Sequence, residues 1–420
     1  MTVRAMSLDV RAARLATMAM LFCNGLLYAT WGVSMPVIKD TFSLSEGTLS
    51  LAMVAVAMGG IVTMAAAGRW IARTGSGRSS RYSGLLMALA AAPVLLVPDY
   101  PVLLALLFAY GTMTAANDVA ANAQVAYLEK ISGRSLIGSV HGSFSAGGLV
   151  GALIASVWLA SSWPSAANFL WLAGTTVLVI ACASRYLKNE PSDHGLIDDA
   201  PSSTAFPDAV VRKRLKLFGV IAFAALVVEG AFYDWSAVYM REVALAPASW
   251  VGAGYAAFAV AMALGRLGGD WLRDHYHHQI VIAGSGIAGV TGLGVVLANH
   301  SPLMVVIGFL ITGFGLANFI PVLFSAASKL SAHVGWPASQ GLAITTRIAY
   351  VGLLVGPLLI GPIAELVGLR LSLLSLLLAI VTMTIGWLLL SRTSSGTPWH
   401  IASDHSPRVP ARTREPTSTP

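Results

Sequence analysis

The feature that most constrains this chain is a series of apolar runs, each about as long as a membrane-spanning helix. A helix needs about 20 apolar residues to cross a bilayer. Twelve runs of this kind follow one another: 12–37, 48–72, 82–98, 101–127, 136–160, 165–186, 215–243, 250–272, 279–298, 302–328, 337–364 and 369–391. They are continuous and not alternating, which favours helices over membrane strands. We therefore predict an all-α membrane protein with twelve transmembrane helices.

Composition and charge agree with this prediction. Only 11% of the 420 residues are charged, against about 25% in a typical soluble domain, and 56% are hydrophobic. The net charge of +7 comes from an uneven distribution, because 22 of the 26 lysines and arginines fall on the side of the membrane that would hold the N-terminus. This is the positive-inside pattern. It predicts an inner-membrane protein with both termini cytoplasmic, and it makes nucleic acid an unexpected partner.

The chain divides at its longest polar stretch. We predict a six-helix bundle over 1–190, a cytoplasmic linker over 191–214, a second six-helix bundle over 215–392, and a disordered cytoplasmic tail over 393–420. The tail is rich in Ser, Thr, Pro and Arg, a composition typical of disorder. The first apolar run is too long for a cleaved signal peptide, so we expect it to remain as a span.

The two halves repeat short motifs in the same order. AVAM occurs at 55–58 and again at 259–262, and GGLVG at 147–151 is echoed by GLLVG at 352–356. The nearly constant offset indicates an internal duplication. Two parallel halves with a site between them are typical of secondary transporters.

Four ionisable residues lie deep within the predicted spans: Asp118, Glu229, Asp234 and Arg347. Each would cost about 2.5–3.5 kcal/mol in contact with lipid at the bilayer centre. We therefore expect them to face a watery passage or one another. Spans three, six, nine and twelve carry no such groups in their central parts, so the polar positions gather where a shared pathway would need them.

Amide and aromatic side chains accompany these charges. The predicted solute-binding residues are Asn24, Tyr28, Trp31, Asn117, Asn122, Gln124, Tyr233, Asp234, Trp235, Asn318, Gln340 and Arg347. Aromatic rings pack against the apolar face of a sugar while amides bind its hydroxyls. The alternative is that the aromatic residues are interface anchors or packing residues.

We assign proton coupling to Asp118, Glu229 and His141. The hypothesis is that Asp118 binds the coupling proton and that His141, at the start of the next span on the same side, tunes or gates it. In the alternative, Asp118 only braces its helix through Asn122 or a main-chain amide. Glu229 carries the proton, binds the solute or neutralises Arg347, and Arg347 in turn binds the solute or serves as a counter-ion. Hydration near the outer face is the alternative role for Asp234.

Other motifs are weak. GSGIAG at 284–289 fits a dinucleotide pattern but lies in an apolar run without a preceding strand, so close helix packing explains it better. HYHH at 275–278 is more typical of a solvated loop than of a metal site, and Cys23 and Cys182 lie within spans. We therefore expect no metal and no cofactor. No Ser, His and Asp spacing suggests hydrolysis, so an enzyme is not expected.

These features resemble the major facilitator superfamily over about 12–391. GRLGGDWLRD at 265–274 resembles its loop signature, while GRWIARTGSGR at 68–78 has Ala72 where the acid is usual. More narrowly, NDVAANAQ, HGSFSAGG and EGAFYDWSAVY resemble the sugar-permease branch typified by fucose permease. That resemblance implies proton-coupled uptake and assigns the fourth-span acid to Asp118. The polar position in the first span is Asn24, not an acid.

The sequence thus predicts a secondary active transporter, acting by alternating access, that takes up a sugar or similar small polar solute with protons. The expected partners are that solute, a coupling proton and the bilayer, and we expect a monomer. A proton-coupled exporter of drugs or metabolites is the first alternative, although the fifth span lacks the Gly-Pro pair of antiporters. A membrane sensor that has lost transport is the second.

Overall fold

The structure is a computed structural model, and it describes residues 3–133, 136–189, 209–336 and 338–392. Within these ranges every regular element is a helix, and short turns and loops connect the helices. The elements are α1 Val3–Val33, α2 Met35–Thr41, α3 Glu46–Thr74, α4 Ser76–Ala91, α5 Tyr100–Ser132, α6 Ile137–Leu159, α7 Ser165–Ala183, η1 Ser184–Tyr186, α8 Ala209–Glu242, η2 Ala248–Trp250, α9 Ala253–His275, α10 His278–Ala298, α11 Pro302–Leu316, α12 Phe319–His333, α13 Ala338–Ala349, α14 Val351–Val367, α15 Leu369–Ser372 and α16 Leu374–Arg392.

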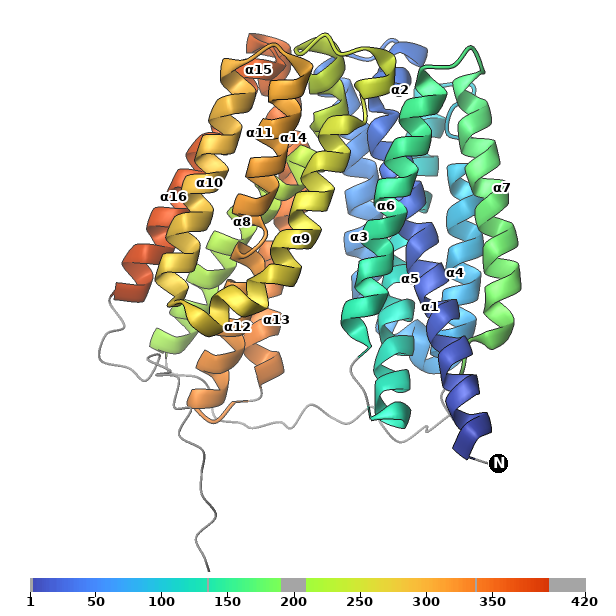
Figure 1. The fold of residues 1–420 in the computed structure, drawn as a ribbon, viewed down its shortest axis with the longest axis vertical. Coiled ribbons are helices and arrows are strands. Elements are labelled where there is room, and N and C mark those ends of the chain that lie inside the picture. Colours follow the sequence, from blue (N-terminus) through green and yellow to red (C-terminus); the bar gives the residue numbers. More distant parts are fainter. Residues whose placement is uncertain (1–2, 134–135, 190–208, 337, 393–420) are drawn as a thin grey trace, which may run out of the picture.

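The helices form two bundles that stand side by side (Figure 1). In the first bundle α1 packs against α5, α6 and α7, and α5 also packs against α3 and α4. In the second, α8 packs against α13, α14 and α16, and α11 lies between α9 and α10. The all-α, two-bundle architecture is the predicted one. α8 begins at Ala209, inside the predicted linker, because Arg, Lys and Leu are good helix formers that extend the helix into the polar segment.

Eleven helical segments of the described chain are long and apolar enough to cross a membrane. The predicted span at 82–98 is the one missing from that set, because α4 has only 16 residues and begins with serines and an arginine. α4 nevertheless packs between α5 and α7 and runs alongside them in Figure 1. It completes the twelve-helix arrangement.

Three predicted spans are interrupted. The first ends at Val33, and a turn at Ser34 leads into the short α2, whose first turn contains Pro36. In the second half, Asn318 separates α11 from α12, and Tyr350 separates α13 from α14. Apolar periodicity does not reveal such breaks, because apolar residues continue on both sides of each one.

The helix that carries Asp118 has well-defined ends. The Asp99 side chain caps α5 by accepting a hydrogen bond of 2.9 Å from the Val102 main-chain N–H, and Pro101 occupies the first turn. Gly133 ends the helix in the left-handed conformation, with φ of 64°. Asp118 therefore sits near the middle of a continuous 33-residue helix.

The repeated glycine motifs pack their helices in the same way in both halves. A Cβ atom on Gly147 of α6 would lie 2.0 Å from the Phe22 carbonyl oxygen of α1. A Cβ atom on Gly352 of α14 would lie 2.4 Å from the Phe223 carbonyl oxygen of α8. Glycine is needed at both positions because the two backbones are in contact. Phe22 and Phe223 are 201 positions apart, so the internal repeat extends to equivalent helix contacts.

The bundles meet through α3 with α14, α6 with α9, and α1 and α2 with α8. The closest approaches lie toward the end that carries α2 and α15, opposite the N-terminus in Figure 1. There a Cβ atom on Gly361 would lie 2.4 Å from the Ser50 side chain, and one on Gly252 would lie 2.2 Å from the Ser156 hydroxyl. Backbone and small residues thus close this end.

Candidate functional site

Asp118 lies in a short chain of polar side chains in the first bundle. Its side chain is half-buried on α5, and Asn122, one turn later, donates from Nδ2 to the Asp118 main-chain oxygen at 2.9 Å. The Asn122 Oδ1 atom lies 2.9 Å from Nε2 of His141, an exposed residue on α6. The Asp118 carboxyl group is within electrostatic range of His141. The structure therefore brings these three predicted residues together, and their roles stay a prediction.

Glu229 forms an ion pair within the second bundle. Nη2 of Arg266, on α9, donates to both carboxylate oxygens of Glu229, at 2.8 and 3.0 Å. The Glu229 side chain is 14% exposed and that of Arg266 is 44% exposed, so one face of the pair is open. Pairing offsets part of the cost of placing a carboxylate in a membrane helix. Arg347 is exposed and forms no ion pair in the described ranges, where Arg266 is the partner of Glu229. The role of Arg347 stays a prediction.

The two acids border the same region of the molecule. Tyr350, at the junction of α13 and α14, is within electrostatic range of both Asp118 and Glu229. These acids belong to different bundles, so Tyr350 marks where the polar groups of the two halves approach each other. We call this set the central polar site; it consists of Asp118, Asn122, His141, Glu229, Arg266 and Tyr350.

Aromatic side chains continue the site toward the end where the bundles meet. Tyr28 of α1 is within electrostatic range of Glu229 and Asp234 of α8. The Tyr233 ring lies 5.2 Å from the ring of Tyr255 on α9. The Tyr255 ring in turn packs against α1 at Gly32, where a Cβ atom would lie 2.8 Å from it. Tyr28 and Tyr233, both predicted to bind solute, thus lie near the junction of the bundles.

Two predicted aromatic residues are packing residues in this conformation. Trp31 and Trp235 are 2% and 1% exposed and belong to the main hydrophobic core. Asp234 is different, because its side chain is buried at 9% exposure yet makes no hydrogen bond or ion pair with any residue in the described part of the chain. Its carboxyl group therefore has no partner, in the described part of the chain, that a solute or a proton would have to displace.

Three of the predicted amides hold helices together inside the first bundle. Asn24 of α1 donates to Asn117 Oδ1 at 3.2 Å, and Asn117 of α5 donates to the Ser80 carbonyl oxygen of α4 at 3.0 Å. Gln124 accepts from the Ser76 hydroxyl at 2.9 Å. All three amides are 0–1% exposed. These contacts leave the Oδ1 atom of Asn24 and the Nε2 atom of Gln124 without a hydrogen-bond partner in the described structure. In this conformation none of the three amides is open to a solute.

The remaining predicted residues lie in the second bundle. Asn318, 3% exposed at the break between α11 and α12, accepts from Nη1 of Arg273 at 3.2 Å. Gln340 and Arg347 lie on α13, where Gln340 is half-buried and Arg347 is exposed. Asn318 is thus tied to α9, whereas Arg347 is a cation open to the surroundings.

A set of ion pairs joins the bundles at their meeting end. Lys39 Nζ lies 2.8 Å from Glu242 Oε1 of α8 and 2.9 Å from Glu46 Oε1 of α3. Asp40, next to Lys39, pairs with Arg241, next to Glu242. The doublets are 202 positions apart, so each half contributes a base followed by an acid at an equivalent position. We call Lys39, Asp40, Arg241 and Glu242 the charge clasp.

Lys39 holds its positive charge more firmly than an ordinary lysine. Partial burial works against the Lys39 charge, but hydrogen bonds to Glu242 and Glu46 outweigh burial and raise the pKa of Lys39. A raised lysine pKa means that the stabilising charge is fully present below the ordinary value and is lost only as the pH rises through the folded-state value.

The two weak motifs, GSGIAG and HYHH, lie on α10 and at the turn between α9 and α10. GSGIAG lies within α10, and a Cβ atom on Gly286 would lie 2.3 Å from the Thr384 hydroxyl of α16. The ring of His275 stacks on Trp271 at 4.6 Å. Within the described ranges, no group of three or more His, Cys, Asp or Glu side chains is arranged to hold a metal ion.

Sequence reasoning missed Arg266, Tyr350 and the clasp. Arg266 had a signal, since it lies inside the apolar run 250–272, but it also matches the loop signature, which groups it with the cytoplasmic bases. The charge clasp also had a sequence signal, because the base–acid doublet Lys39–Asp40 is repeated at Arg241–Glu242. Tyr350 had none, because a tyrosine beside an apolar run is typical of ordinary packing.

Two pseudo-equivalent bundles of membrane-spanning helices, with ionisable groups between them, define a multi-pass membrane transporter. Residues 17–346 match the family model of the Major Facilitator Superfamily, and the chain belongs to this superfamily. It is 32% identical over 356 residues to an uncharacterised MFS-type transporter of Yersinia pestis, covering 84% of this chain and 89% of that protein. It is 30% identical over 379 residues to the membrane protein MosC of Rhizobium meliloti, covering 90% of each.

Solved structures show the same fold at low sequence identity. A bacterial homologue of the human lysosomal transporter Spinster, inward-facing and unoccupied, has a TM-score of 0.73 at 14% identity, covering 92% of this chain and 97% of that one. The nucleoside transporter NupG has a TM-score of 0.71 at 11% identity, covering 90% and 99%. A D-xylose-proton symporter has a TM-score of 0.70 at 14% identity, covering 90% and 97%.

Proposed function

We propose that the protein takes up a sugar or similar small polar solute together with protons, by alternating access between its two bundles. The observation that carries this proposal is the central polar site, in which Asp118 of one bundle and Glu229 of the other both lie within electrostatic range of Tyr350. A passage between rocking bundles requires polar groups from both halves at one level. The closed charge clasp at one end fits a protein opening toward the other.

Asp118 is the proposed proton carrier. Unlike Glu229, it has no cation bound directly to its carboxylate in the described structure, and its neighbour His141 is exposed. Water and burial act in opposite directions on the proton affinity of a carboxyl group. Alternate opening of the two ends would therefore load and release a proton, with His141 acting on Asp118 by its charge and through Asn122.

The proposed solute contacts are the Glu229–Arg266 pair, Asp234, and the rings of Tyr28 and Tyr233. Acids, a guanidinium and aromatic faces together suit a hydroxyl-rich solute. The resemblance to the fucose-permease branch supports this choice. So does the shared fold with a D-xylose-proton symporter and a nucleoside transporter, whose solutes carry several hydroxyl groups.

Proteoliposomes test the proposal directly. A panel of labelled sugars is offered to reconstituted protein under an imposed inward proton gradient, and a protonophore provides the control. We expect accumulation of at least one sugar that disappears when the gradient is collapsed. Efflux of a preloaded solute under the same gradient would instead identify an exporter. Complete absence of flux across the panel would contradict sugar transport and favour the sensor alternative.

A further inference from the structure

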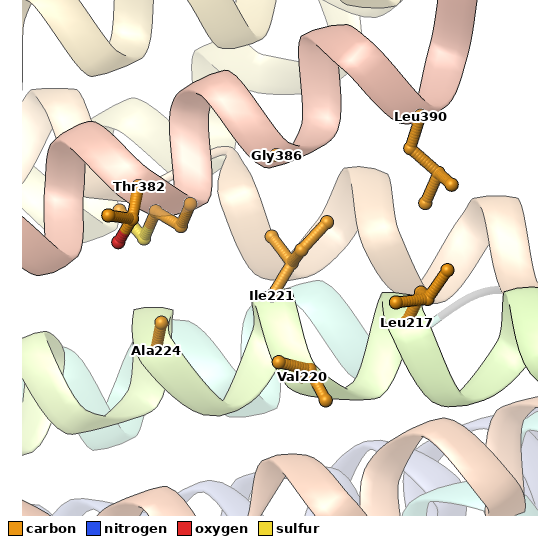
Figure 2. A pocket seen from close by; sticks show the side chains of 8 residues that line it. Leu217, Val220, Ile221, Ala224, Thr382, Gly386 and Leu390 are labelled. Atoms are coloured by element: carbon orange, nitrogen blue, oxygen red, sulfur yellow. The ribbon is translucent and has the colours of Figure 1, made fainter. Parts of the chain in front are cut away.

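A groove lies between α8 and α16, away from the central polar site (Figure 2). Its volume is about 270 Å³. Figure 2 shows Leu217, Ile221 and Ala224 on the side of α8 that faces α16, with Thr382 and Leu390 opposite them. Gly386 of α16 leaves the middle of the groove open, because a Cβ atom there would find its nearest neighbour, Ile221, only at 3.8 Å.

The lining selects an apolar occupant. Thr382 is the one polar side chain among the eight lining residues, and its hydroxyl already donates to the Ala379 carbonyl oxygen at 3.0 Å. Sites for polar solutes place several unsatisfied polar groups in the pocket, and this groove has none. A hydrocarbon chain matches its chemistry.

The groove opens on the outer surface of the second bundle. Val220 is 54% exposed and Leu217 is 38% exposed. In Figure 1, α16 lies on the side of this bundle that faces away from the first, with the N-terminal part of α8 beside it, whereas the C-terminal part of α8 reaches the first bundle. The main packing partners of α16 are α8 and α10 of its own bundle. An open apolar groove on this face of a membrane transporter lies against the acyl chains of the bilayer.

Basic residues stand at one end of the groove. α8 begins with the sequence AVVRKRLK, and Lys213 and Arg214 precede Leu217 by four and three positions. Residues with this spacing share a helix face, so both cations lie in line with the lining. In the described structure no carboxylate pairs with Lys213 or Arg214. An anionic group at this end would be complemented by two positive charges.

The dimensions match one leaflet. At a rise of about 1.5 Å per residue, the eleven steps along the helix from Lys213 to Ala224 cover about 16 Å. Half of a hydrocarbon core of about 30 Å is about 15 Å. A chain lying in the groove with its headgroup at Lys213 would therefore reach from the membrane surface to the midplane.

We propose that the α8–α16 groove is a binding site for an anionic phospholipid, with one acyl chain along Leu217, Ala224 and Gly386 and the phosphate at Lys213 and Arg214. Basic pockets between transmembrane helices bind anionic headgroups in this way. The site goes beyond solute transport, since it shares no residue with the central polar site. One wall of the groove is α8, the helix that carries Glu229, so a bound lipid would restrict the movement of that helix.

Native mass spectrometry of the purified full-length protein tests the site with phosphatidylglycerol and phosphatidylcholine of identical chains. We expect the wild-type protein to retain at least one phosphatidylglycerol under conditions that strip phosphatidylcholine. Gly386→Leu fills the groove and should remove that lipid. Gly174→Leu is the matched control, because Gly174 is exposed on α7 and a Cβ atom there would meet no other atom within 4 Å. Equal retention in both variants would overturn the proposal.

A second pair of variants tests the contact with the lipid headgroup. Lys213→Ala should weaken phosphatidylglycerol binding about five-fold, the effect of removing one basic residue near an anionic headgroup. Arg212→Ala removes the same charge from the neighbouring position, about 130° from the groove face of the helix, and should change binding less. Lys213→Ala lies outside the packed helix contacts, so it stays informative if Gly386→Leu does not fold. Equal affinity for the two lipids in the wild-type protein would also overturn the proposal.

Discussion

At the scale of single residues, the cost of placing a charge in a membrane explains why each acid has polar neighbours. Asp118 contacts Asn122, which contacts His141, and Glu229 contacts Arg266. A carboxylate in hydrocarbon is costly, and each acid is instead placed beside polar groups. The two acids differ in what neutralises them, and that difference leads to separate predictions.

Asp118→Asn should abolish uphill solute accumulation and leave solute exchange intact. Asparagine keeps the shape and the helix but cannot carry a proton, so coupling is lost while solute binding remains. The measurement is uptake and counterflow in the same proteoliposomes. Asp99→Asn is the control, because it changes an acid of the same helix at the N-cap, where asparagine also caps well. Normal uphill uptake by Asp118→Asn would exclude it as the proton carrier.

Glu229→Gln should destabilise the protein more than the double variant Glu229→Gln with Arg266→Gln. The single change leaves the guanidinium unpaired, at a cost of about 1–3 kcal/mol. This is less than for a fully buried pair, because 44% of the Arg266 side chain is exposed. Apparent Tm in detergent, measured for both single variants and the double variant, checks this. Additive losses would mean that the pair contributes no coupling.

How far the site was predictable depends on the residue type. The intramembrane acids stood out in the sequence because charge is costly in lipid, and Asp118 and His141 do lie close together. The role of the amides could not be predicted in this way, since a buried amide such as Asn117 can form hydrogen bonds between helices as readily as it can bind a solute. Arg266 was hidden by a motif that resembles a loop. Partner identity depends on three-dimensional packing, which the sequence pattern does not contain.

At the scale of elements, the charge clasp joins α2 to the end of α8. Its Lys39 has one partner in each bundle, Glu46 in its own and Glu242 in the other. Of these two Lys39 contacts, only the one with Glu242 has to break, together with the Asp40–Arg241 pair, for the bundles to separate at this end. The two glutamates therefore form a matched pair for an experiment.

Glu242→Gln should loosen the closed end, whereas Glu46→Gln should not. The readout is labelling of Ser50→Cys, in a protein whose Cys23 and Cys182 have been replaced, by a membrane-impermeant thiol reagent. Ser50 is 1% exposed where α3 meets α14, so labelling reports opening. We expect faster labelling with Glu242→Gln alone. Equal rates in the two glutamine variants would show that the clasp does not hold this end closed.

The same clasp predicts a pH dependence. The pKa of Lys39 is raised, so its charge and its contribution to closure persist below the ordinary lysine value of about 10.4 and fade only above it. Ser50→Cys labelling should therefore be slow and constant up to that pH and accelerate beyond it, after correction for thiol ionisation. Lys39→Met, which lacks the charge, should remove the transition. Persistence of the transition in that variant would assign it to another group.

At the scale of the whole molecule, the bundles are joined at one end and carry the central polar site between them. Alternating access requires the joined end to part. A short bismaleimide bridging Asp40→Cys and Arg241→Cys, in the same cysteine-replaced background, should block uptake. Each single-cysteine variant treated with the reagent should transport normally. Undiminished uptake by the bridged protein would show that separation at the clasp is not part of the cycle.

Much of the overall architecture followed from the sequence, because a bilayer leaves few choices to apolar runs of about 20 residues. The division into halves followed from the repeats. The interruptions at Asn318 and Tyr350 were not predicted, although Pro321 was an available signal for the first, since proline is tolerated in the first turn of a helix but breaks its interior. The span predicted at 82–98 was placed too far along the chain, because apolar loop residues at 92–98 prolong the hydrophobic signal beyond Ala91 while α4 begins with polar residues at Ser76.

The interruptions are unevenly distributed between the halves. α5 and α6 run unbroken through the first bundle, whereas their repeat counterparts are divided at Asn318 and Tyr350 into α11 with α12 and α13 with α14. The first bundle has one break, at Ser34 between α1 and α2. Bending during the transport cycle should accordingly concentrate in the second half, where two spans and not one are divided.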